Sequence, residues 1–210
     1  MLDVYAFSTP NSVKVPIVLE ELGLKYRLHA VNIRAGGQRT PEFQALNPNA
    51  KVPVLVDHDV VDGPLTLTES AAILVYLAER SGRLLPSAGA GRARVFEQLF
   101  FHASALGVAF GNAGYFRKLA PETLPHAIDR FGAEALRVLG VLDDVLARSA
   151  FVAGDELSIA DVAHYGWLWR REFAGVALDG HLNVARWCAA LDERPGFRRG
   201  VERTVALAQT

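Results

Sequence analysis

Strand-like patterns end near residue 68 of this 210-residue chain, and no convincing strand follows. The first apolar run, Leu2 to Phe7, stops at a stretch with strong turn chemistry, Ser8 to Ser12. Apolar residues then recur at helical spacing up to Gly23, at positions 15, 18, 19 and 22. Pro16 is best tolerated in a first helical turn, which predicts that this helix starts close to residues 11–13.

The same alternation continues through the rest of the first third of the chain. Tyr26 to Ile33 predicts a second strand, and a strand–helix–strand order implies a right-handed parallel crossover. A short helix is expected over Pro41–Leu46, and two further strands over residues 52–56 and 65–68. A helix should run from Glu69 to about residue 80. The sum is βαβ plus ββα, an α/β arrangement.

Beyond this region the sequence predicts helices alone. Residues 83–91 are rich in Gly, Pro, Ser and Ala, as linkers are. Apolar residues then recur at steps of three and four across residues 128–145, and Ser158 with Asp161 has the spacing of a capping box that opens a helix. The predicted organisation is an α/β domain at residues 1–82, a linker at 83–91 and an all-helical domain at 92–210.

Composition excludes several classes of function. The formal net charge is −1, so the overall field would attract neither nucleic acid nor an anionic membrane surface. The longest uncharged stretch, Gln98 to Phe116, contains polar residues and glycines, which favours a buried helix over a membrane span. The N-terminus lacks the features of a signal peptide, so a cytoplasmic protein is expected. There is no paired Cys/His spacing for a metal, and Cys188, the only cysteine, is expected to be a buried, inert thiol.

Four segments recur in a characteristic order and together span nearly the whole chain. They are TPNSVKV leading into LEELG (9–23), PEF with NPNAKVP (41–53), LTESAAIL continuing to YL (67–77), and FVAGDELSIAD (151–161). In this order and spacing they resemble the cytosolic glutathione S-transferases. The Thr-Pro-Asn segment is most similar to the bacterial nu class and its disulfide-bond oxidoreductase relatives. The resemblance implies a thioredoxin-like domain that binds glutathione, followed by a helical domain that completes a second-substrate pocket.

The resemblance assigns glutathione contacts to several residues. In the family the proline at the position of Pro53 is cis, which turns the Val52 backbone outward to pair with the cysteinyl unit of an extended glutathione. A strand-initiating trans proline is the alternative. Gln38 and Lys51 are expected to reach the backbone and glycyl carboxylate of the tripeptide.

Glu69 and Ser70 stand where a strand becomes a helix, and a helix N-terminus suits a carboxylate. By resemblance, Ser70 and its N–H hold the γ-glutamyl carboxylate, and Glu69 accepts from the α-amino group. Taken alone, Thr-Glu-Ser before an apolar run would be ordinary capping. The Ser158–Asp161 pair serves folding in the family and has no catalytic role.

The chemistry requires a thiolate, because a free thiol with a pKa of roughly 8.5 is mostly protonated at neutral pH. By resemblance, the Thr9 hydroxyl and an Asn11 amide N–H are the catalytic donors that stabilise it. Ser8 and Tyr5 are competing hydroxyls, although Tyr5 is expected in the core. Asn11 could also be an N-cap of the first helix.

The sequence departs from the family pattern at three places. Ser12-Val13 replaces a glycine and a bulky residue, and Ala50 replaces a glycine. The segment 107–112 is similar to the second-substrate loop but lacks its proline and methionine. The second-substrate pocket implied by the resemblance comprises Phe110, Asn112 and Arg130.

The leading hypothesis is therefore an enzyme that uses glutathione as co-substrate, without a metal, and activates its thiolate. The thiolate would attack a hydrophobic electrophile (conjugation, as in detoxification) or a disulfide (reduction). A homodimer is expected from the family. The alternatives are a non-catalytic ligand- or protein-binding member of the same fold, and a thiol-lyase or isomerase.

Overall fold

The computed structural model describes residues 1–209 and divides the chain into two compact units. The first unit combines Met1–Arg83 with the C-terminal segment that begins at Glu193, and the second comprises Leu84–Asp192. The division at residue 83 lies close to the predicted linker at 83–91. The C-terminal segment packs within the first unit, whereas the sequence pattern places all of 92–210 in a helical domain.

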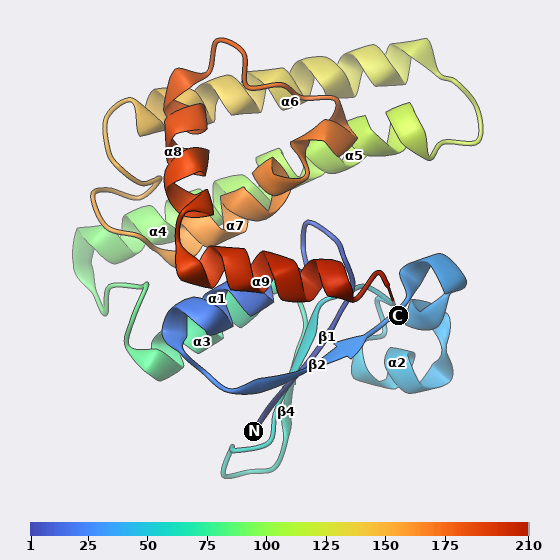
Figure 1. Cartoon of the computed structure of the whole chain (residues 1–210), viewed down its shortest axis with the longest axis vertical. Helices are drawn as coiled ribbons and strands as arrows, with labels where there is room; N and C mark the ends of the chain where they lie inside the picture. The colour runs from blue at the N-terminus through green and yellow to red at the C-terminus, as the bar shows by residue number, and fades with distance from the viewer. Residues whose placement is uncertain (210) are drawn as a thin grey trace. The chain divides into compact units, whose positions relative to one another are not determined.

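A four-stranded mixed sheet forms the first unit, in the order β2-β1-β3-β4 (Figure 1). Its strands are β1 (Leu2–Ala6), β2 (Tyr26–Ala30), β3 (Val54–Asp57) and β4 (Leu65–Leu67). β1 pairs with β2 in parallel, with Leu2 opposite Tyr26, and with β3 antiparallel, with Tyr5 opposite Val54. The predicted βαβ-ββα arrangement is confirmed. The predicted strand ends at Ile33 and Val52 are wrong, because a 3-10 turn begins at Ile33 and a cis Val52–Pro53 peptide precedes β3.

Helices cover both faces of this sheet. α1 (Lys14–Leu22) and α3 (Ser70–Ser81) lie on one side of the strands in Figure 1, and α2 (Pro41–Leu46) lies on the other. α1 ends at Gly23, which adopts a left-handed φ of 70°, as its sequence predicts. The helix begins at Lys14, later than expected, because residues 8–13 form hydrogen-bonded turns of their own.

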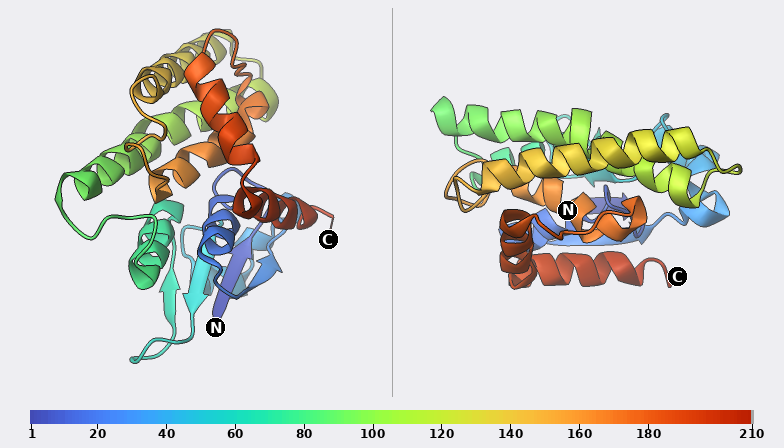
Figure 2. Two further views of the ribbon diagram at one scale, coloured as in Figure 1. Left: turned by 60° about the vertical axis from the view of Figure 1, so that its left-hand side comes forward. Right: turned by 90° about the horizontal axis from the view of Figure 1, so that it is seen from above.

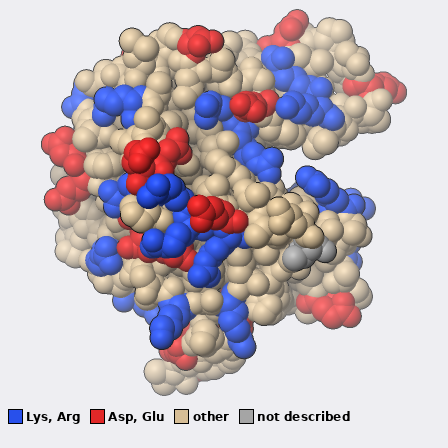
Figure 3. Space-filling model, in the orientation of Figure 1, with Lys and Arg blue, Asp and Glu red and all other residues tan. Residues whose placement is uncertain are grey.

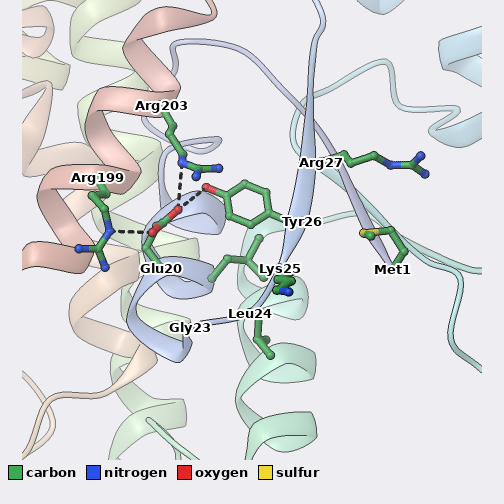
Figure 4. Close-up of a pocket in the computed structure, with 10 residues that line it drawn as sticks. Met1, Glu20, Gly23, Leu24, Lys25, Tyr26, Arg27, Arg199 and Arg203 are labelled. Carbon is green, nitrogen blue, oxygen red and sulfur yellow. Dashed lines mark hydrogen bonds and ion pairs between the residues drawn. The ribbon is translucent and has the colours of Figure 1, made fainter.

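The C-terminal helix α9 (Pro195–Ala206) packs along α1 within the same unit. A Cβ at Gly200 would lie 2.6 Å from the backbone of Ile17, so the two helices approach too closely for a larger residue. Ion pairs add to this contact. Figure 4 shows Arg199 and Arg203 of α9 directed at Glu20 of α1, at 2.8 and 3.1 Å.

The second unit is built from helices joined by loops, with no named strand among its described residues (Figure 2). It contains α4 (Gly89–Phe101), a π-helical turn (His102–Leu106), α5 (Gly107–Lys118), α6 (Pro125–Leu146), α7 (Ile159–Trp169) and α8 (Leu182–Asp192). The capping box predicted at Ser158 and Asp161 is present at the start of α7. The π-helical turn interrupts the long uncharged stretch, and no helix within residues 1–209 is long and apolar enough to cross a membrane.

Candidate functional site

The loop that follows β1 is organised by two hydroxyls. The Thr9 hydroxyl donates to Ser12 Oγ at 3.0 Å and accepts from the Ser12 backbone N–H at 3.1 Å. Ser12 is fully buried, and its Oγ also accepts from the Phe7 N–H at 3.3 Å. The serine that replaces the family's glycine is therefore built into the loop, and it takes the proton of Thr9.

Asn11 lies at the exposed tip of the same loop. Its Oδ1 accepts from Lys14 Nζ at 2.8 Å, so the donor end of this exposed amide, Nδ2, takes no part in that contact. Asn11 is not an N-cap, because the N-cap position of α1 is Val13 and has no side-chain cap. Its amide is thus a hydrogen-bond donor in the loop where the family resemblance implies the thiolate binds.

Lys14 joins this loop to the start of α3, a role that the sequence patterns do not predict. Its side chain is 1% exposed, and its Nζ contacts Ser70 Oγ at 3.2 Å as well as Asn11. Burial lowers the pKa of Lys14 to about 7, against the attraction of the Glu69 carboxylate. A signal existed in the sequence, because Lys14 stands four residues before Val18, on the apolar face of the helix.

Glu69 and Ser70 lie at the N-terminus of α3, and Ser70 is joined to the loop after β1 through Lys14. Ser70 is the first helical residue and is half-buried, so its N–H belongs to the donors that a helix N-terminus leaves unpaired. Glu69 precedes it with a φ of +64°, a conformation rare for a residue with a side chain and typical of ligand-binding positions. The two residues together offer donors for a carboxylate and an acceptor for an amine.

Val52 supplies unpaired backbone groups shortly before β3. The Val52–Pro53 peptide is cis, as the resemblance implies, and Val52 lies outside β3. Within the described part of the chain, no hydrogen bond joins the Val52 N–H or carbonyl to another group. An extended peptide could therefore pair with this residue as an added strand would.

The remaining predicted contacts of the first unit differ in their surroundings. Gln38 lies in a 3-10 turn, and its Oε1 is buried without a hydrogen-bond partner among residues 1–209. Such an acceptor is usually satisfied, and a ligand N–H would satisfy it. Lys51 is exposed, and only its backbone carbonyl is engaged, by Asn47 Nδ2 at 2.7 Å.

The ring of Tyr5, the other competing residue, packs within the first unit. Tyr5 packs against the core cluster of Val31, Phe43 and Val54, and its ring stacks on that of His29 at 4.7 Å. Tyr5 is thus half-buried against the core rather than fully within it.

The three residues assigned to a second-substrate pocket belong to the second unit. Phe110 is fully buried in α5, Asn112 donates to the Val108 carbonyl of its own helix at 2.9 Å, and Arg130 is exposed on α6. Phe110 could thus affect a pocket only through the packing around it, whereas Arg130 is free to meet a ligand.

The cationic cavity of the first unit is already occupied by an internal carboxylate. An open cavity of about 460 Å³ beside Glu20 is lined by cationic side chains, but Arg199, Arg203 and the Tyr26 hydroxyl all bind the Glu20 carboxylate (Figure 4). Basic and acidic residues are interspersed on the face drawn in Figure 3. No group of metal-ligating side chains occurs among residues 1–209.

Comparisons with known proteins agree with this geometry. The model for the glutathione S-transferase N-terminal domain matches residues 9–80, and the model for the C-terminal domain matches residues 118–195. The disulfide-bond oxidoreductase YfcG of Escherichia coli is 40% identical over 199 residues, which cover 93% of this chain and 92% of YfcG.

Solved structures extend the comparison to bound ligands. A glutathione transferase family member from Pseudomonas fluorescens, with two glutathione bound, has a TM-score of 0.90 and 37% identity, covering 96% of this chain and 92% of that one. A glutathione transferase from Pseudomonas putida, with one glutathione disulfide per subunit, has a TM-score of 0.88 and 37% identity, covering 96% and 90%.

Proposed function

Because the chain belongs to the glutathione S-transferase family, we propose that it binds glutathione and stabilises its thiolate for attack on a disulfide or an electrophilic carbon. The observation that carries the proposal is the set of donors in the first unit. The Asn11 amide, the Ser70 hydroxyl and the N–H groups at the start of α3 belong to one hydrogen-bonded group around Lys14. They suit the two anionic ends of the tripeptide, its sulfur and its γ-glutamyl carboxylate.

The rest of the tripeptide has partners in the same unit. The Val52 backbone pairs with the cysteinyl unit, Gln38 Oε1 accepts an N–H of the ligand backbone, and Lys51 meets the glycyl carboxylate. Glu69 accepts from the α-amino group. The buried oxygen of Gln38 supports this assignment, because it accepts no hydrogen bond from residues 1–209 and is available to a ligand N–H.

Disulfide reduction is the activity that this chain favours. The thiolate of one glutathione attacks a sulfur of the substrate disulfide, forming a mixed disulfide and releasing one substrate thiol. A second glutathione then attacks the mixed disulfide, so that glutathione disulfide leaves and the other substrate thiol is released. No protein sulfur takes part, because Cys188 is 6% exposed and burial raises the pKa of its thiol to about 12. The relatives with two glutathione molecules or glutathione disulfide bound support this sequence of steps.

Asn11 is the main thiolate donor in this proposal. The Thr9 proton is already given to Ser12 Oγ, whereas the Asn11 Nδ2 is exposed and its oxygen is held by Lys14. The test titrates the ultraviolet absorbance of the bound thiolate in wild type, Asn11→Ala and Thr9→Val. Asn11→Ala should raise the pKa of the bound thiol by about one unit, the value of one good hydrogen bond to an anion, and Thr9→Val should raise it less.

Activity assays on the same proteins complete the test. Reduction of a model disulfide and conjugation of a hydrophobic electrophile should both fall in Asn11→Ala. If wild type binds glutathione with an unperturbed thiol and shows neither activity, the chain is a non-catalytic binding member of the fold and the proposal is wrong.

The protein's setting is also part of the proposal. We expect a cytoplasmic homodimer with a role in detoxification or thiol maintenance, because glutathione is kept reduced in the cytosol and the chain contains no disulfide among its described residues. The exposed side chains of Phe100 and Val108 are of the kind that a subunit interface buries. Sedimentation velocity measures the oligomeric state directly.

A further inference from the structure

Lys14 occupies a position that disfavours a cation in two ways. It is the first residue of α1, where the helix dipole places partial positive charge, and its side chain is 1% exposed. Lysine is rarely buried unless its ammonium is bound by other groups. A methionine or leucine would fill the same volume without the desolvation cost of an ammonium. Packing alone therefore does not explain an amine at this position.

The contacts of the amine supply that reason. An ammonium has three donors and no acceptor, so whatever it binds must present an oxygen to it. Its Nζ is 2.8 Å from Asn11 Oδ1, which turns the Asn11 Nδ2 to the opposite, exposed side of the amide. Its Nζ is also 3.2 Å from Ser70 Oγ, and this contact uses a lone pair of that oxygen and leaves the hydroxyl proton free to donate elsewhere.

We propose that Lys14 is a positioning residue that fixes Asn11 and Ser70 as hydrogen-bond donors, one for the glutathione sulfur and one for the γ-glutamyl carboxylate. This inference rests on the proposed function. Both side chains can either donate or accept, and an anion-binding site needs them to donate. One buried amine satisfies the accepting atoms of both, so that only their N–H and O–H groups face the ligand.

Electrostatics favour the same role. The positive charge stands one hydrogen bond behind each donor and strengthens both, because a donor that itself accepts from a cation is polarised. The Glu69 carboxylate stabilises the charged form of Lys14, against the burial that lowers its pKa to about 7. The residue therefore couples the sulfur end of the site to the carboxylate end.

The test compares Lys14→Met, which removes the amine, with Lys14→Gln, which keeps an uncharged donor, and with Lys25→Met, an exposed control in the same unit. Lys14→Met should raise the pKa of the bound glutathione thiol by about one unit and weaken glutathione binding. Measured at slightly acidic pH, this shift corresponds to a tenfold loss of the thiolate form. Lys14→Gln should restore part of both. Lys25→Met should change neither.

A double variant separates positioning from a general structural effect. If Lys14 acts on the sulfur through Asn11, adding Lys14→Met to Asn11→Ala should raise the thiol pKa no further, although binding should still weaken through Ser70. Urea midpoints verify that each variant is folded. The inference is overturned if wild type and Lys14→Met bind glutathione with the same thiol pKa, or if the effects of Lys14→Met and Asn11→Ala on that pKa simply add. Failure of wild type to bind or acidify glutathione would instead refute the proposed function.

Discussion

Replacing Lys14 with methionine should stabilise the fold while impairing the site. Methionine has a similar length and no charge, so it fills the buried volume without the desolvation that an ammonium suffers. The hydrogen bonds lost include those to Asn11, which is exposed, and to Ser70, which is half-buried, and water can replace the amine at both.

The magnitude follows from the pKa of the buried amine. Burial lowers the pKa of Lys14 from 10.5 to about 7 in the folded chain, which corresponds to about 5 kcal/mol at about 1.4 kcal/mol per pH unit. Below pH 7 both the folded and unfolded chains are protonated, and the full penalty applies. Between pH 7 and 10.5 the unfolded chain holds a proton that the folded chain has released, so the stability of wild type rises with pH across this window.

The assay is urea denaturation of wild type, Lys14→Met and the exposed control Lys25→Met at several pH values from 6 to 10, without glutathione. Lys14→Met should be more stable than wild type by up to about 5 kcal/mol at the acidic end, and the difference should close as the pH rises. Lys25→Met should follow wild type at every pH. A Lys14→Met variant less stable than wild type at acidic pH, or a difference that does not depend on pH, would refute the reasoning.

Substitutions at four further positions test the packing, the backbone and a buried hydrogen-bond network. Gly200→Ala should lower the free energy of unfolding by about 2–3 kcal/mol, because its Cβ would stand 2.6 Å from the Ile17 backbone. Gly140→Ala, where nothing lies within 4 Å, should instead raise it by about 0.5–1 kcal/mol, and equal urea midpoints for the two would contradict this account. Ala50→Gly should raise the unfolding free energy by about 0.5 kcal/mol, since Ala50 has a φ of +53° that glycine adopts without strain, and a lower midpoint in calorimetry would count against it. Asp161→Ala should cost about 3–4 kcal/mol, because this buried carboxylate accepts from the Val152 and Ser158 N–H groups and from Trp187 Nε1. Asp161→Asn should cost less, and a far-ultraviolet melt that fails to rank the two in this order would exclude the capping network as the cause.

The elements of the first unit follow from local patterns in the sequence, and their boundaries do not. Gly23 ends α1 by adopting a left-handed φ. This property belongs to the single residue, so the sequence alone predicts it. The start of α1 depends on hydrogen bonds between Thr9 and Ser12 that compete with a helical turn, so the periodicity places it too early. The end of β2 likewise depends on Asn32, whose side chain accepts from two backbone N–H groups and starts a 3-10 turn.

The π-helical turn at His102–Leu106 could not be predicted from the sequence for a different reason. It lies inside an apolar stretch with uniform helical character, and Gly107, at its end, lets the ring of Trp167 approach to within 3.2 Å of where a Cβ would stand. The contact joins residues about sixty positions apart. No periodicity within the stretch can report a partner that far along the chain.

The role proposed for Lys14 is not predicted by either sequence pattern alone, because two patterns have to be combined. Helical periodicity places it among buried positions, and its charge would normally place it in solvent. The contradiction is itself the signal, since a buried lysine at a helix N-terminus needs oxygens to bind. Those oxygens belong to Asn11 and Ser70, which only the fold brings together across 56 positions of sequence.

Ser12 shows how a departure from the family can decide which donor acts. A glycine at this position would leave the Thr9 hydroxyl free to rotate toward a bound sulfur. In this chain the fully buried Ser12 Oγ accepts the Thr9 proton and the Phe7 N–H, and breaking either bond would leave a polar group unsatisfied. Asn11 has no such competitor for its Nδ2, because Lys14 binds only the oxygen of its amide. If the proposed function holds, serine at position 12 favours a thiolate contact with the Asn11 amide over one with the Thr9 hydroxyl, and Ser12→Gly should return part of that contact to Thr9.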